Sequence, residues 1–253
     1  MATSTIAYLA NPATDREHSD LEHTSPILCL SRIDLLETLS SEDLEWLSNR
    51  LPEICLNRDQ LLYTPEYRGE VIFLLLEGRV RLYKMVEAQE LTLDIVEAGS
   101  VFGTASLAQR PQWSYAEALE PSRVGLLGLH ILRHLVVRHP QVGLKAIELL
   151  AERLYHRESK LADIGLKEVP ARLASLLLHL LEREGLVSAA GYKIATRYTH
   201  EQLATMVGAR RVAVTRAFGK LQNVGAVKQK RRHIYIKDRG TLERIAKRDK
   251  KTG

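Results

Sequence analysis

The sequence predicts an α+β protein: an N-terminal antiparallel β-roll of the jelly-roll kind, a long helix, and a C-terminal winged helix-turn-helix. Three patterns predict this architecture. Short apolar segments broken by glycine turns fill residues 57–128, apolar residues at heptad spacing run from 147 to 164, and a capped helix pair with a basic hairpin occupies 199–236. At about 150 residues per domain, a chain of 253 residues suits one to two domains.

The composition excludes several classes of protein. The longest apolar run, residues 71–76, is far shorter than the ~20 residues that cross a bilayer. The N-terminus lacks the charged and apolar segments of a secretory signal. Two cysteines, Cys29 and Cys55, are too few for a disulfide framework or a thiolate-bound cluster, and we expect both to be ordinary buried thiols. We therefore expect a cytoplasmic protein that makes no membrane contact.

Charge is distributed unevenly along the chain. Residues 167–253 hold 20 of the 36 Lys and Arg residues but only 7 of the 31 Asp and Glu residues, a net charge of +13, so the preceding residues carry a net charge of −8. A basic segment of this size usually faces a polyanion, and nucleic acid is the commonest one. A solvated basic surface without such a partner is the alternative.

The N-terminal part begins with a polar stretch, residues 1–25, that lacks apolar periodicity and predicts a mobile tail. Ser40 then predicts the start of a short helix, because its hydroxyl can cap the helix and Asp43 follows three residues later. Near-alternating apolar segments separated by the turns at Gly78 and Gly99 follow. They predict an antiparallel barrel or roll within a domain of residues 26–140.

A helix is predicted over residues 141–166. Its apolar residues recur at alternating steps of three and four, which is the seam of a dimerising coiled coil. The predicted seam residues are Ile147, Leu150, Leu154, Leu161 and Ile164, with Arg157 in the remaining position. The alternative is that the stripe packs on the β domain of its own chain. Gly165 ends the helix and Pro170 begins the next one, so the domain boundary is expected near Leu166.

The strongest local signal lies in residues 199–216. Thr199 and Gln202 have the spacing of a capping box, Gly208 supplies a turn, and a second helix is expected from about Arg210 to Gln222. A basic hairpin over residues 227–236 completes the wing. We expect the winged helix-turn-helix to span residues 167–240 and a basic tail to span 241–253.

On the second helix, Arg211 and Thr215 share one face and Arg216 lies beside them. A helix of this kind can enter a major groove, where its first arginines reach guanine O6 and N7. The wing would meet phosphate. The predicted phosphate contacts are Thr199, Arg210, Lys230 and Arg231.

Over about residues 30–240 the chain resembles the cyclic-AMP receptor/FNR family of bacterial transcription regulators. The resemblance is carried by Gly78, by the segment 99–103, by the heptad helix, by residues 169–177 and by the recognition segment. It implies a homodimer with a cyclic-nucleotide-binding-like sensor domain, a palindromic promoter site on double-stranded DNA, and contact with RNA polymerase.

Within this resemblance the recognition arginines are Arg211 and Arg216, and Val212 stands where many members carry Glu. The ending Val-x-Val-Thr-Arg is similar to that of the cyanobacterial global nitrogen regulator. We add Val212 to the base-reading residues. Because a valine cannot accept a hydrogen bond from cytosine N4, we expect a changed base preference.

The nucleotide-binding members hold the cyclic phosphate with a Gly-Glu pair and a later Arg-Ser or Arg-Thr pair. This chain has Gly103-Thr104 and Trp113-Ser114, so a bound phosphate would lack its bidentate arginine. We therefore predict a regulator that is not gated by cyclic AMP. The candidate effector-pocket residues are Gly103, Thr104, Ser106, Ser114 and Arg157.

Alternatives remain open for the effector. Gating by a cyclic nucleotide is one of them, and gating by an anionic metabolite such as a 2-oxo acid, bound beside Arg157, is another. Arg157 could instead pair with Glu152 or Glu158 across a dimer. We predict no cofactor and no metal, and we expect His130 and His134 to be surface residues of a helix rather than haem ligands.

Two other classes of protein were weighed. A β-roll can be a metal-dependent enzyme of the cupin kind, but residues 57–128 contain no histidine, so we predict no catalytic residues and no enzyme. A nucleotide-sensing module that does not touch DNA is disfavoured by the winged helix-turn-helix and by the basic C-terminal third.

Overall fold

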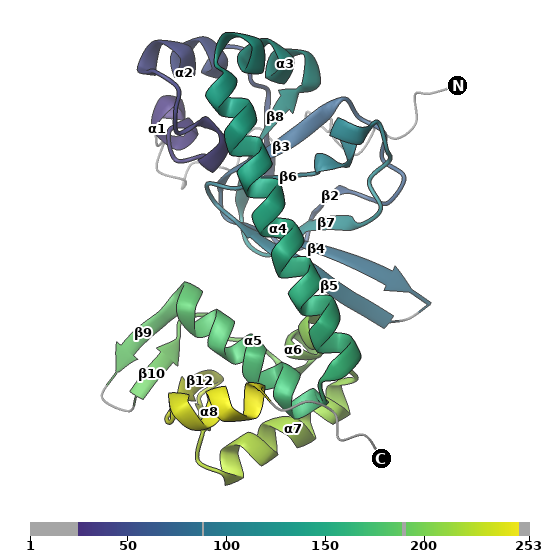
Figure 1. Cartoon of the computed structure of the whole chain (residues 1–253), viewed down its shortest axis with the longest axis vertical. Helices are drawn as coiled ribbons and strands as arrows, with labels where there is room; N and C mark the ends of the chain where they lie inside the picture. Colours follow the sequence, from purple (N-terminus) through teal and green to yellow (C-terminus); the bar gives the residue numbers. More distant parts are fainter. Residues whose placement is uncertain (1–24, 88, 189–190, 248–253) are drawn as a thin grey trace. The chain divides into compact units, whose positions relative to one another are not determined.

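A computed structural model describes residues 25–87, 89–188 and 191–247, which form two compact units (Figure 1). One unit runs to Met85 and resumes at Leu93–Glu152, and the other comprises Val86–Thr92 and the chain from Arg153. The predicted mobile tail lies, apart from Ser25, outside the described residues. The predicted boundary near Leu166 stays a prediction.

The first unit is built on two four-stranded antiparallel sheets, which confirms the predicted β-roll. One sheet has the order β1 (Glu53–Leu56), β8 (Ser122–Gly128), β3 (Val71–Glu77) and β6 (Val101–Phe102). The other has the order β2 (Leu61–Tyr63), β7 (Tyr115–Ala118), β4 (Arg79–Val86) and β5 (Gln89–Glu97).

Strand β3 explains the apolar run found in the sequence. Successive side chains of a strand point to opposite faces. Phe73 and Leu75 join the core between the sheets, whereas Ile72, Leu74 and Leu76 join a second core with the helices. The run is uninterrupted because both faces of this central strand are covered.

Short helices cover the outer face of β3. They are α1 (Pro26–Leu30), η2 (Asp34–Leu36), α2 (Ser41–Ser48) and α3 (Leu129–Arg138), while η3 (Thr104–Ala108) follows β6. The Ser40 hydroxyl accepts a hydrogen bond from the Asp43 backbone N–H at 3.2 Å, which confirms the predicted cap.

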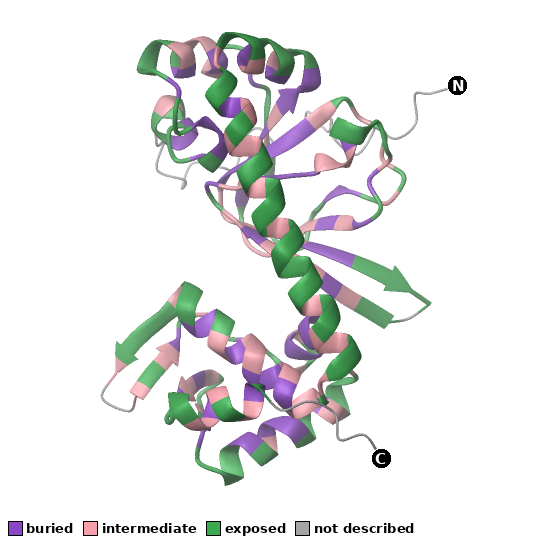
Figure 2. Cartoon of the chain, in the orientation of Figure 1, coloured by how far each residue is buried: buried purple, intermediate pink, exposed green. Residues whose placement is uncertain are grey.

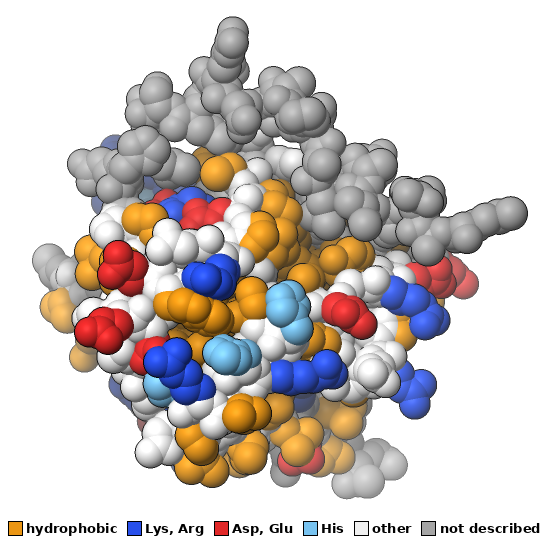
Figure 3. All heavy atoms as spheres, turned by 90° about the horizontal axis from the view of Figure 1, so that it is seen from above, with side chains coloured by type: hydrophobic (Ala, Val, Ile, Leu, Met, Phe, Trp, Pro, Cys, Tyr) orange, Lys and Arg blue, Asp and Glu red, His pale blue; other side chains and the backbone are white. Residues whose placement is uncertain are grey.

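His130 and His134 are exposed on α3, as expected from the sequence. The view onto this end of the structure shows histidine side chains at the surface among basic and apolar ones (Figure 3). The ring of His134 stacks on Trp46 with centroids 5.3 Å apart. Both histidines therefore serve the surface of an amphipathic helix.

The two cysteines differ in burial. Cys29 is buried as expected, and its Sγ lies 3.0 Å from Nη2 of Arg123. Burial raises the pKa of the Cys29 thiol, although Arg123 acts in the opposite direction. The expectation for Cys55 was wrong, because its side chain is exposed on β1, a strand at the edge of its sheet.

Helix α4 (Pro140–Leu166) spans the predicted heptad region as one 27-residue helix. Most of it is exposed, as the colouring along α4 shows (Figure 2). Val142, near its N-terminus, is its buried residue. A helix of this length with so little burial within its own chain leaves an apolar stripe in contact with solvent.

Beyond the end of α4, the second unit contains helices α5 to α8 and a small sheet. The helices are α5 (Val169–Glu184), α6 (His200–Val207) and α7 (Arg211–Asn223), followed by α8 (Arg239–Ala246). The sheet has the order β11 (Val227–Lys230), β12 (His233–Ile236), β10 (Gly191–Ile194) and β9 (Gly185–Ser188).

Two parts of this unit were missed by the sequence analysis. The β9–β10 hairpin extends the wing into a four-stranded sheet. Residues 241–246 of the predicted basic tail belong to α8 instead, because the Asp238 side chain caps the helix and Leu242 and Ala246 are buried on one face. Residues 248–253 of that tail lie outside the described residues. Among the described helices, none combines the length and the apolarity of a membrane span.

Candidate nucleic-acid interface

The helix pair α6–α7 is fixed at both ends of α6. The predicted capping box is present: Thr199 Oγ1 accepts from the Gln202 backbone N–H at 3.1 Å, and Gln202 Oε1 accepts from the Thr199 N–H at 2.9 Å. Gly208 ends α6 at a φ of 64°, a left-handed conformation that favours glycine. Nη1 of Arg172 on α5 donates to the carbonyl of Val207 at 2.8 Å and so satisfies a carbonyl at the C-terminus of α6.

Helix α7 presents one face to the core and one to solvent. Its buried side chains are Val214, Ala217, Phe218 and Leu221. The four predicted base-reading residues, Arg211, Val212, Thr215 and Arg216, are all exposed. The structure thus brings them together on the solvent side of one helix, next to Arg210, which occupies its N-cap position.

Thr215 has a partner that the sequence analysis missed. Its Oγ1 lies 3.0 Å from Nδ1 of His200, the first residue of α6, and the His200 ring packs on Phe218 with centroids 5.1 Å apart. His200 therefore fixes the rotamer of Thr215. The separation of 15 residues hid this pair, because only the crossing of α6 and α7 joins them.

The wing turns at Arg231 and Arg232, which have positive φ values of 49° and 67°. Two central residues with positive φ make the type I′ turn that matches the twist of a two-residue hairpin, a turn that usually carries Asn-Gly. Two arginines in this conformation are strained. The turn therefore carries two positive charges, although Asn and Gly would adopt this backbone conformation with less strain.

One face of the wing sheet is basic. Ile234 and Ile236 of β12 are buried, so His233 and Tyr235 point to the opposite face. Lys230 is the partner of His233, and Tyr235 is flanked by Lys228 on β11 and Lys193 on β10. Directly opposed residues share a face, so the lysines gather on the outward side.

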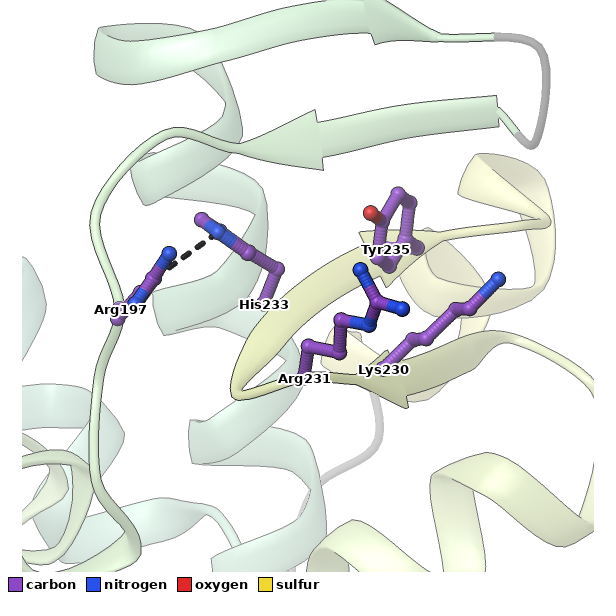
Figure 4. A pocket seen from close by; sticks show the side chains of 5 residues that line it. All are labelled: Arg197, Lys230, Arg231, His233 and Tyr235. Atoms are coloured by element: carbon purple, nitrogen blue, oxygen red, sulfur yellow. Dashed lines mark hydrogen bonds between the residues drawn. The ribbon is translucent and has the colours of Figure 1, made fainter.

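A pocket of about 360 Å³ opens beside the turn end of the wing hairpin. Arg197, Lys230, Arg231, His233 and Tyr235 line it, and Figure 4 shows Arg197 reaching toward the hairpin from the loop before α6. Nε of Arg197 donates to Nε2 of His233 at 3.0 Å. The structure joins the predicted Lys230 and Arg231 to Arg197, His233 and Tyr235, which were not among the predicted phosphate contacts.

Glu184, at the end of α5, holds the loop that carries Arg197. Its Oε1 accepts from the Tyr198 hydroxyl at 2.7 Å, and its Oε2 accepts from the backbone N–H of Thr196 at 3.1 Å and from the Thr196 hydroxyl. Both neighbours of Arg197 are thereby tied to one carboxylate. The backbone of Arg197 is fixed while its side chain extends toward the wing.

The candidate effector residues are divided between the two units. Gly103, Thr104, Ser106 and Ser114 lie in the first unit, whereas Arg157 is exposed in the second. Among the described residues, no group of three or more His, Cys, Asp or Glu side chains is placed to hold a metal ion.

The loop after β6 is closed on the core. Nε2 of the buried Gln112 donates to the carbonyl of Gly103 at 2.7 Å and to Oγ of Ser106 at 3.2 Å. A Cβ on Gly103 would collide with the ring of Phe73. That ring packs against Phe102 with centroids 5.3 Å apart and against Tyr63 at 5.2 Å. An aromatic cluster therefore fills the space beneath the loop.

Known families match both halves of this chain. The cyclic nucleotide-binding domain matches residues 53–139, and the Crp-like helix-turn-helix domain matches residues 171–245. A CRP-like cAMP-activated global transcriptional regulator of Mycobacterium tuberculosis is 24% identical over 221 residues, 87% of this chain and 97% of that protein.

Two further relatives and one solved structure are also similar to this chain. The global nitrogen regulator of Synechocystis is 26% identical over 71% of this chain and 82% of its own length. The cyclic AMP receptor protein of Thermus thermophilus is 31% identical over 70% of this chain and 80% of its own length. A solved CooA mutant from Carboxydothermus hydrogenoformans shares the fold, with a TM-score of 0.73 at 24% identity over 84% of this chain and 94% of that one.

Fold, exposed α7 face and relatives together define a transcription regulator with a winged helix-turn-helix DNA-binding domain. The chain belongs to the CRP/FNR family. Regulators of this family bind DNA, typically act as dimers and are typically not enzymes.

Proposed function

We propose that this regulator binds double-stranded DNA as a homodimer at a palindromic promoter site, with α7 of each subunit in a major groove. The exposed face of α7 is the observation that supports the proposal most directly. Its four side chains, Arg211, Val212, Thr215 and Arg216, lie opposite the buried residues that anchor the helix in the core. In a two-fold dimer the two copies of α7 would meet half-sites about 34 Å apart, one helical turn of DNA.

The exposed stripe on α4 supports the dimer. Ile147, Leu154 and Leu161 are 65%, 58% and 71% exposed within one chain, and Leu150 is also exposed, while Ile164 is partly covered. Leucine and isoleucine at heptad positions are what a coiled-coil partner covers. A second copy of α4 would remove these side chains from water.

Replacing Leu154 by Asp tests the dimer. A charge at the seam would be buried unpaired, so we expect sedimentation equilibrium to give two chains for the unaltered protein and one for Leu154→Asp. DNA affinity should fall with the dimer. Tyr155→Asp, on the neighbouring exposed position of α4, is the matched control and should leave the mass at two chains. A monomeric unaltered protein would overturn the proposal.

We infer that cyclic AMP does not gate this regulator. The aromatic cluster under Gly103 and the loop bonds of Gln112 support this inference, as does the lack of an arginine beside Ser114. We expect calorimetry to detect no heat of cyclic AMP binding and DNA affinity to be unchanged by it. Tight binding of cyclic AMP would contradict the inference, whereas binding of a 2-oxo acid would favour an anionic effector.

We also propose that the regulator acts in the cytoplasm and that the DNA-bound dimer contacts RNA polymerase, with no cofactor required. Membership of the family supports this step. Transcription from a template that carries the selected site, with purified polymerase and no added ligand, tests it. We expect the amount of transcript to change when the regulator is added, and an unchanged amount would contradict the proposal.

A further inference from the structure

The pocket beside the turn end of the wing hairpin is lined by three cationic side chains and no carboxylate. Arg197 belongs to the loop before α6, Lys230 to β11 and Arg231 to the turn, and the phenol of Tyr235 stands beside them (Figure 4). Three positive charges gathered around one small space repel one another unless an anion lies between them. A phosphate group suits such a site, because it offers several charged acceptors to arginine and lysine donors.

We infer that this pocket binds a single phosphate of the DNA backbone, held by Arg197, Lys230 and Arg231, with His233 as the residue that positions Arg197. The inference rests on the proposed function, since it assigns a further contact of the same DNA-binding domain. It adds Arg197, His233 and Tyr235 to an interface otherwise ascribed to α7 and the wing turn.

Arg197 is oriented from two sides. Glu184 fixes Thr196 and Tyr198, the residues before and after it, and His233 accepts from its Nε. A guanidinium has five N–H donors, and the bond to His233 uses one of them, so a bidentate pair can still face a phosphate. The ordering of this long side chain occurs within the protein before DNA arrives.

His233 can accept this hydrogen bond only while the ring nitrogen lacks a proton. Its partial burial lowers the pKa of His233, Lys193 and Arg197 lower it further, and the backbone of Ile194 acts in the opposite direction. These effects favour the neutral imidazole. Its role is to orient a cation, and it does not supply the charge.

The surroundings of the pocket favour a polymer over a small free anion. Positive charge continues beyond the pocket on the outward face of the sheet, where Lys228 and Lys193 flank Tyr235 on the two neighbouring strands. A lone anion would fill the pocket and leave these lysines unused. A phosphate backbone repeats its charge along its length and can meet both.

The test replaces Arg197 by Gln and measures DNA binding by fluorescence anisotropy across a range of salt concentrations. Losing one of the three charges on this phosphate should weaken binding about fivefold near 0.15 M salt and reduce the slope of log K against log salt, by no more than the roughly 0.9 of a whole phosphate contact. The preferred bases should not change. Arg244→Gln, on α8 and away from the pocket, removes the same charge and should leave the slope unaltered.

A second arm locates the phosphate. Duplexes that carry one neutral methylphosphonate at a time should show one position per half-site at which the unaltered protein loses more affinity than Arg197→Gln does. At all other positions the two losses should add. If no position couples to Arg197, the pocket does not hold a phosphate and the inference fails.

His233 is tested by its two kinds of replacement. His233→Gln keeps an acceptor near the Nε2 position and should bind DNA within about twofold of the unaltered protein, whereas His233→Leu should match Arg197→Gln, and the two changes together should cost no more than one. Equal losses in both His233 variants would overturn the positioning role.

Failure of the pocket can be separated from failure of the proposed function. If the unaltered protein selects a symmetric site while Arg197→Gln keeps its full salt slope, the pocket inference alone is wrong. If no site is selected at all, the proposed function is wrong.

Discussion

On α7, the buried residues determine which single side chains face the solvent. Val214 and Phe218 fix the helix in the core, and this leaves Arg211 and Thr215 together on the outside. The capping box at Thr199 could be predicted because its two members are three residues apart. The bonds from His200 to Thr215 and from Arg197 to His233 could not, since each joins segments that meet only in the folded chain.

Arg211→Ala should reduce affinity for the preferred site by about 1–3 kcal/mol, because a bidentate contact to guanine is lost. Competition binding against sites altered at single positions should show relaxed preference at one guanine. Glu201→Ala, an exposed residue of α6, serves as the control. An equal loss on every sequence would instead assign Arg211 to the phosphates.

Val212 is 61% exposed on the same face. A carboxylate in its place could accept a hydrogen bond from cytosine N4, so Val212→Glu should move the preference at one base pair of each half-site toward cytosine. Selection from a randomised duplex pool measures this shift. Val212→Ala should leave that position without the new preference, and an unchanged site for Val212→Glu would remove Val212 from the base-reading residues.

Among the helices and strands, the number of buried residues and the regularity of their spacing decide which elements can be predicted from the sequence. The apolar run in β3 and the heptads of α4 are visible in the sequence because each repeats over many residues. Helix α8 has only Leu242 and Ala246 on its buried face, among many charges, and so resembled a tail. The β9–β10 hairpin carries exposed apolar side chains and gave no alternation to detect.

The wing turn offers a test in which stability and binding change in opposite directions. Arg231→Asn with Arg232→Gly places the usual type I′ pair at positive φ, so the free energy of unfolding should rise by about 0.5–1 kcal/mol. Two positive charges are lost, so binding should weaken on any DNA and the salt slope should flatten. Urea unfolding and anisotropy measure the two effects.

A lower free energy of unfolding for this double variant would contradict the claim that the arginine turn is strained. Unaltered DNA affinity would contradict the claim that the turn contacts phosphate. The pair Lys237→Gln with Arg244→Gln removes the same charge outside the turn and serves as the control. It should leave the salt slope in place.

Over the whole molecule, the acidic and the basic parts of the sequence correspond to two different structural regions. The acidic part supplies the β-roll and α4, whereas the basic last third supplies the winged helix-turn-helix. The fold class could be predicted because periodicity, capping and charge agreed, whereas the family was predicted from the resemblance of these segments to known regulators. The aromatic packing inside the β-roll could not be predicted, because Phe73 and Phe102 lie on strands that are distant in the sequence.

We propose that this regulator reads a two-fold symmetric site without an added effector. Binding of the purified full chain to a randomised DNA pool, followed by sequencing of the bound fraction, tests it most directly. We expect enrichment of a palindrome whose half-sites lie one helical turn apart. Salt-sensitive binding with no enriched sequence, or enrichment of a single unpaired half-site, would contradict it.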